Sequence, residues 1–135
     1  MRDRHILLAG SVLGGLGVAL GAFGAHWLEG AVEQWDLAPD EQLKRLATWE
    51  VAVRYQMYHA LALIAVGLLA TRTHSSHLVW VAKLFIAGVT IFSGCLYVLV
   101  LTGIKVLGAI VPIGGTCMIV GWILLAVSAW RARQE

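Results

Sequence analysis

Side chains capable of chemistry are concentrated in one segment of this apolar chain, residues 49–59. Tyr55, Gln56 and His59 share one face of a helix there, because residues three and four apart in sequence lie one above the other. An imidazole can relay protons near neutral pH, ligate a metal or join a hydrogen-bond network. Glu50 and Arg54 lie almost opposite, one helical turn apart, in a good orientation for an ion pair.

Residues from other segments reach a similar depth, so we expect a polar cluster in one half of the molecule. Three interpretations remain open: a structural hydrogen-bond network, a site for a small ligand, quinone, lipid or ion, and ligation of a haem or metal by His26 and His59. The candidate cluster comprises His26, Arg54, Tyr55, Gln56, His59, Ser93 and Tyr97.

The sequence carries no complete catalytic set. Ser93 and Ser128 lack a local nucleophile motif, and no carboxylate pair lies within the apolar segments. Cys95 and Cys117 have no metal-type spacing, and we interpret them as small packing residues. We therefore predict no enzymatic activity, no metal and no cofactor, with haem at His26 and His59 as the minor alternative.

The composition indicates that lipid is the main solvent of the chain. Hydrophobic residues make up 59% of the 135 residues and charged residues 13%, against roughly 45–50% and 25% in soluble domains. A soluble fold of this size could not bury so much apolar surface. The net charge of +2 is too small to indicate binding to nucleic acid.

Four stretches are long enough to cross a bilayer, which takes about 20 mostly apolar residues. They cover residues 6–28, 49–71, 78–101 and 107–130, within one transmembrane domain that spans residues 1–135. Short connections favour antiparallel neighbours, so we predict an all-α, four-helix antiparallel bundle. Residues 40–48 resemble a short outer amphipathic helix that runs into the second span.

Positive residues and tryptophans predict the orientation and the span ends. Arginine is more frequent on the side of both termini than on the other side, which predicts that both termini face the cytoplasm. The residues on the side of the termini are Arg2, Arg4, Arg72, Arg131 and Arg133, and those opposite are Lys44, Arg45 and Lys105. Five tryptophans near the span ends are typical of an aromatic belt: Trp27, Trp35, Trp49, Trp80 and Trp130.

Small residues predict where the helices approach one another closely. The glycines of the first span fall within roughly 80° of arc on a helix, which favours packing within the chain over a dimer interface. Further packing positions lie in the third and fourth spans. The predicted packing set is Gly10, Gly14, Gly17, Gly21, Gly24, Gly94, Pro112 and Gly115.

Four ordered motifs resemble those of a known family of small bacterial membrane proteins, the YgdD/YwdK-like family. They are GAFGAH at 21–26, YQMYHALA at 55–62, FSGCLY at 92–97 and PIGG at 112–115. The family carries a domain-of-unknown-function label and has small eukaryotic transmembrane relatives. The resemblance implies a four-helix inner-membrane protein and supplies no established activity.

The leading functional prediction is a membrane accessory or scaffold protein. Its partners would be membrane lipids and a larger membrane protein complex or a second copy. The first alternative is a small carrier, channel or lipid- or quinone-binding protein with a polar pocket in its outer half. The second is a haem-binding electron carrier.

Overall fold

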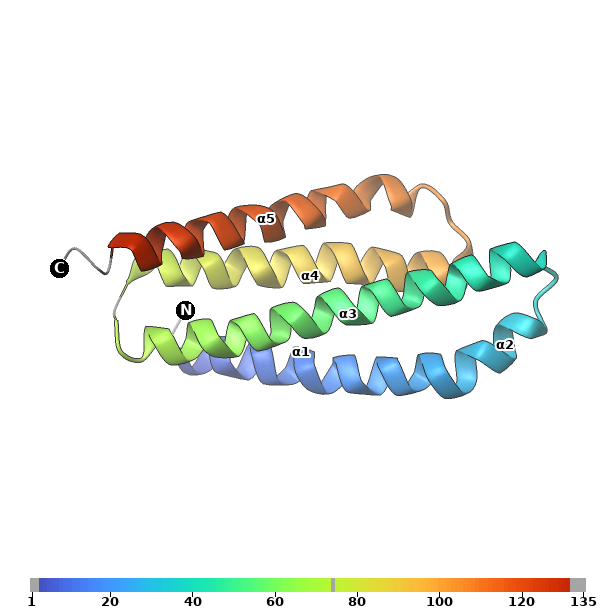
Figure 1. Cartoon of the computed structure of the whole chain (residues 1–135), viewed down its shortest axis with the longest axis horizontal. Helices are drawn as coiled ribbons and strands as arrows, with labels where there is room; N and C mark the ends of the chain where they lie inside the picture. The colour runs from blue at the N-terminus through green and yellow to red at the C-terminus, as the bar shows by residue number, and fades with distance from the viewer. Residues whose placement is uncertain (1–2, 74, 132–135) are drawn as a thin grey trace.

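A computed structural model describes residues 3–73 and 75–131, which form helices without a strand among them. Arg2 and Arg133, which entered the prediction of orientation, lie outside these residues. The helices follow one another in a simple order along the chain (Figure 1). They are α1 (Asp3–Phe23), the π-helical segment η1 (Gly24–Leu28), α2 (Glu29–Glu33), α3 (Pro39–Ala70), α4 (Ser76–Thr102) and α5 (Leu107–Arg131).

Four helical stretches are long and apolar enough to cross a membrane, which confirms the predicted number of spans. The first, Asp3–Glu33, combines α1, η1 and α2, and the other three are α3, α4 and α5. Successive spans run in opposite directions, so the antiparallel four-helix bundle is confirmed as well (Figure 1). We call the end that holds both termini the terminal end, and the other the distal end.

The start of α3 follows the usual chemistry of a helix N-terminus. Ala38 is extended, Pro39 occupies the first turn, and Asp40 and Glu41 complement the positive end of the helix dipole. The amphipathic helix predicted at 40–48 is therefore the first part of one 32-residue helix. At 1.5 Å per residue this helix is about 48 Å long, so it extends beyond a hydrocarbon core of about 30 Å.

The four spans form a staggered layer in which α3 and α4 are central. The first span packs mainly on α3, and α5 packs on α4, so these two helices occupy opposite edges (Figure 1). In the most apolar stretch of each span, 17% of residues are buried in the first span and in α5. The corresponding shares are 44% in α3 and 33% in α4. The edge helices therefore present most of their surface to lipid.

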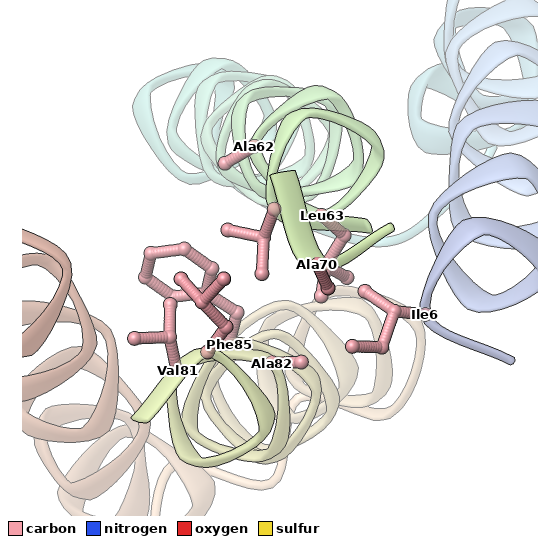
Figure 2. Close-up of a cluster of buried hydrophobic side chains, with 9 residues drawn as sticks. Ile6, Ala62, Leu63, Ala70, Val81, Ala82 and Phe85 are labelled. Carbon is pink, nitrogen blue, oxygen red and sulfur yellow. The ribbon is translucent and has the colours of Figure 1, made fainter. Parts of the chain in front are cut away.

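The main apolar core lies in the terminal half, between the two central helices. Phe85 and Val81 of α4 face Leu63 of α3, and Ile6 reaches the same cluster from α1 (Figure 2). All four side chains are almost fully buried. A second cluster at the distal end comprises Leu28, Val32, Trp49 and Val100.

The glycine stripe of α1 and η1 faces α3. A methyl group on Gly10 would lie 2.9 Å from the carbonyl oxygen of Ala60, and one on Gly24 would lie 2.7 Å from the Trp49 indole. Gly14, Gly17 and Gly21 also have α3 atoms within 4 Å of that position. In a membrane, such absent side chains allow two helices to gain dispersion contacts at short range.

The contact between α4 and α5 depends on two glycines that the helical pattern does not single out. A methyl group on Gly114 would lie 2.5 Å from the backbone nitrogen of Phe92, and one on Gly88 would lie 3.0 Å from the carbonyl oxygen of Gly114. Gly94, predicted to lie at a packing face, instead has nothing within 4 Å of an added methyl group. Gly115 makes only an ordinary contact, at 3.9 Å from Phe92.

Pro112 lies inside α5 and is exposed. The hydroxyl of Thr116 donates to the Pro112 carbonyl over 2.9 Å, so this polar pair stays within one helix.

Candidate functional site

Gln56 connects three helices through its side-chain amide. Its Nε2 donates to the carbonyl oxygen of Leu13 in α1 over 2.8 Å, and its Oε1 accepts from the Tyr97 hydroxyl of α4 over 2.9 Å. The amide is 4% exposed. Because neither lipid nor water reaches a group this deeply buried, both bonds offset a desolvation cost that would otherwise be large.

His59 lies one turn further along α3 and connects it to α5. Its Nδ1 lies 2.8 Å from the carbonyl oxygen of Tyr55, and the Trp122 indole donates to its Nε2 over 3.1 Å. The imidazole also packs edge-on against Phe85, with ring centroids 5.1 Å apart. The ring is therefore turned inward and surrounded by aromatic side chains.

The two hydrogen bonds of His59 define its tautomer. An indole N–H can only donate, so Nε2 must carry a lone pair. A carbonyl oxygen can only accept, so Nδ1 must carry the proton. The pair of bonds therefore requires a neutral, Nδ1-protonated imidazole, and it leaves no ring nitrogen free for a ligand.

We expect this tautomer to be visible by 15N NMR on protein labelled at histidine and held in nanodiscs. One histidine should show a protonated Nδ1 and an unprotonated Nε2, and this signal should be absent from His59→Gln. In Trp122→Phe the same signal should shift, because Nε2 loses its donor. A His59 signal with the proton on Nε2 would contradict the arrangement.

A third bond between helices completes the network. The hydroxyl of Ser93 on α4 donates to the carbonyl oxygen of Ala52 on α3 over 2.8 Å, and Ser93 is 1% exposed. Within 3–73 and 75–131, no buried side-chain nitrogen or oxygen lacks a hydrogen-bond partner. The buried polar side chains therefore have their hydrogen bonds satisfied within the protein, mainly by bonds between the helices.

The structure brings together only part of the predicted cluster. Gln56, His59, Ser93 and Tyr97 join the network on the inner side of α3. Tyr55 is 41% exposed, with its ring 4.9 Å from that of Phe92.

Arg54 and His26 lie outside the network. Arg54 is exposed and, among the residues that the structure describes, pairs only with Glu50, while His26 is exposed on η1.

The two histidines proposed for haem ligation are far apart along the bundle. Gly24 packs on Trp49, so η1 is level with that part of α3, and His59 lies ten residues further on. Ten residues of helix correspond to about 15 Å. With both ring nitrogens of His59 already bonded, this arrangement does not suit joint ligation of one iron. No group of three or more His, Cys, Asp or Glu side chains in the described parts of the chain could hold a metal ion.

Arg45 organises the distal end, a role that sequence patterns alone did not indicate. Its Nη1 donates to the carbonyl oxygen of Val100 over 2.7 Å, and its Nε lies 3.4 Å from Glu41. The guanidinium thereby satisfies a terminal carbonyl of α4 and complements the negative end of that helix dipole. Gly103 follows with φ 73°, a left-handed conformation that favours glycine, and it leaves room for the guanidinium.

Trp49 differs from the other tryptophans of the expected belt. It is 3% exposed, donates from its indole nitrogen to the Leu20 carbonyl over 2.9 Å, and packs 4.6 Å from the Tyr97 ring. Trp27, Trp80 and Trp130 are exposed, as residues of a belt would be. Trp49 is therefore a core residue between α1, α3 and α4.

A separate open groove lies between α1–η1 and α3 at the distal end. It has a volume of about 330 Å³ and carries three charged side chains, those of Glu29, Glu50 and Arg54. Gly21, Gly24 and Ala25 form its wall on the side of the first span. This groove is distinct from the His59 and Gln56 network, none of whose residues line it.

Fold and site together define a small four-span membrane protein whose polar core joins its helices. A family model described as "Protein of unknown function (DUF423)" matches residues 20–115. The UPF0382 membrane protein YwdK of Bacillus subtilis (strain 168) is 44% identical over 124 residues, 91% of this chain and 94% of that protein. A UPF0382 membrane protein of Staphylococcus haemolyticus (strain JCSC1435) is 42% identical over 93% of this chain and 94% of its own length.

The chain therefore belongs to the DUF423 family, which confirms the resemblance found in its four motifs. The relatives' names describe membrane proteins and assign no activity to them. No solved structure matches the chain.

Proposed function

We propose that the chain is a membrane accessory or scaffold protein that binds another membrane protein through the lipid-facing sides of α1 and α5. The observation that carries this proposal is the exposure of these two edge helices, each of which packs mainly on one neighbour. Leu16 of α1 and Ile119 of α5 are 51% and 61% exposed on these outer faces. A helix with a free face can pack on a further helix through shape and dispersion.

The buried network favours this role over that of a carrier. Gln56, His59 and Tyr97, on which a transport or binding pocket would depend, are bonded to one another's helices or to backbone. Such bonds stabilise one arrangement of the helices, which suits a protein that binds its partner through its outer surface.

Photocrosslinking in intact cells tests the scaffold role. A benzophenone amino acid replaces Leu16, Ile119 or, as a matched control on central α3, the 60% exposed Leu61. We expect Leu16 or Ile119 to capture one defined membrane protein that Leu61 does not capture. Crosslinks to lipid alone from all three positions would contradict the proposal. Capture of the same proteins from all three positions would contradict it as well.

We also propose that both termini face the cytoplasm, in the inner membrane of a bacterium. The sequence places Arg2, Arg4, Arg72, Arg131 and Arg133 on the side of the termini, against Lys44, Arg45 and Lys105 on the opposite side. Excess Lys and Arg mark cytoplasmic loops. Fusion of alkaline phosphatase to the C-terminus should give no activity, and fusion within the 34–38 connection should give high activity; the reverse result would contradict this orientation.

A further inference from the structure

The groove between α1–η1 and α3 carries charges that the fold itself leaves almost unused. Arg54 Nη2 lies 3.8 Å from Glu50 Oε2, which is beyond hydrogen-bond length. The two side chains are 54% and 75% exposed, so their pairing contributes little. The carboxylate of Glu29, at the start of α2, makes neither a hydrogen bond nor an ion pair with any described residue. The groove thus presents one guanidinium and two carboxylates to whatever enters it.

The depth of Arg54 in the membrane allows its guanidinium to reach the phosphate of a lipid headgroup. Val53 packs on Gly21 and Trp49 on Gly24, so Arg54 is level with Gly21, six residues before the exposed Trp27. Six residues of helix are about 9 Å, which puts the Arg54 backbone below the interface that Trp27 marks. Because Glu50 is one turn closer to the distal end, the guanidinium points outward, to the level of lipid headgroups.

The charges follow an order along the membrane normal that matches one kind of headgroup. Arg54 lies deepest, Glu50 lies one turn further out, and Glu29 begins the helical turn after η1. In a phospholipid the phosphate lies next to the acyl chains, and an amine, where present, lies beyond the phosphate. The exposed residues Tyr58 and Leu61 continue the face of α3 below Arg54, where acyl chains would run.

We propose that this groove binds a phospholipid with a primary ammonium group, such as phosphatidylethanolamine. Arg54 donates to the phosphate, and Glu50 and Glu29 accept from the ammonium N–H groups, which makes each contact a charge-assisted hydrogen bond. The three protein groups sum to one negative charge, which disfavours a purely anionic headgroup. A choline headgroup has no N–H to donate. The site is independent of the scaffold role, so either proposal can fail alone.

Native mass spectrometry of the full chain, stripped of lipid in mild detergent, tests the site. The probes are dioleoyl phosphatidylethanolamine, phosphatidylcholine, phosphatidylglycerol and dioleoylglycerol at equal concentrations. We expect one molecule of phosphatidylethanolamine to be retained about tenfold more than phosphatidylglycerol or phosphatidylcholine, since one or two charge-assisted hydrogen bonds distinguish these headgroups. Arg54→Gln should lower its retention severalfold, because the phosphate loses its donor, and the double variant Glu29→Gln, Glu50→Gln should abolish the preference over phosphatidylcholine.

A matched pair of steric variants separates the groove from the rest of the surface. Ala25→Leu fills the groove wall and should reduce ethanolamine-lipid retention severalfold. Gly15→Leu introduces the same leucine side chain on a part of α1 where an added methyl group has nothing within 4 Å, and it should leave retention unchanged. Equal retention of the phospholipids by the natural protein, full retention by Arg54→Gln, or an equal effect of Ala25→Leu and Gly15→Leu would overturn the proposal.

Discussion

Replacing Gly114 by alanine should lower the free energy of unfolding by about 2–3 kcal/mol, as overpacking of a tight contact does. The added methyl group would lie 2.5 Å from the backbone nitrogen of Phe92 and 2.8 Å from the carbonyl oxygen of Gly88. Backbone atoms cannot turn aside as a flexible side chain can, so α4 and α5 must separate. The loss is measured by unfolding in mixed micelles at increasing dodecyl sulfate.

Gly94→Ala is the matched control for this prediction. It makes the same chemical change on α4, at a position with nothing within 4 Å. Since alanine favours a helix by up to about 1 kcal/mol over glycine, this variant should be as stable as the natural protein or slightly more stable. Equal destabilisation by Gly114→Ala and Gly94→Ala would show that the close crossing of α4 and α5 is not the cause.

The second large effect is expected for Gln56→Leu, which removes both bonds that join α1, α3 and α4. Hydrogen bonds between helices in a membrane contribute about 0.6 kcal/mol on average and up to about 1.7 kcal/mol. We therefore expect a loss of about 2 kcal/mol, because both bonds disappear and the hydroxyl of the half-buried Tyr97 is left without its acceptor. Tyr97→Phe alone should cost less, about 1 kcal/mol.

A double-mutant cycle of Gln56→Leu and Tyr97→Phe isolates their shared bond. The double variant should be no less stable than Gln56→Leu, because Tyr97→Phe removes the hydroxyl that Gln56→Leu leaves without an acceptor. Thr90→Val serves as control, since the Thr90 hydroxyl donates to the carbonyl oxygen of Ile86 in its own helix over 2.8 Å. Additive losses for Gln56→Leu and Tyr97→Phe would contradict a direct bond between the two side chains.

Composition and helical period were enough to predict the number of spans, the first glycine stripe and the shared face of Gln56 and His59. These features depend on residues close in sequence, and the period of a helix determines which of them share a face. The same reasoning placed Tyr55 beside His59, but only the latter is buried. A helical projection gives the angle between side chains without giving the rotation of the helix relative to its neighbours.

The features that sequence reasoning missed join residues far apart in the chain. Trp122 bonds to His59 across 63 residues, and Arg45 bonds to Val100 across 55. Neither pair forms a local pattern, because each depends on how far two helices slide along each other. Gly114 and Gly94 also look alike in sequence, and only the α4–α5 crossing distinguishes them.

The staggered layer has a consequence for how the chain matures. Each span packs chiefly on a span that precedes or follows it directly, α1 on α3, α3 on α4, and α4 on α5. Each span after the first therefore finds a neighbour on which it packs already in the bilayer when it leaves the insertion machinery, and contacts between spans that are not adjacent in sequence are few. The bundle can therefore assemble span by span, and the hydrogen bond from the Trp122 indole to His59 forms last, because α5 is the last span to enter the membrane.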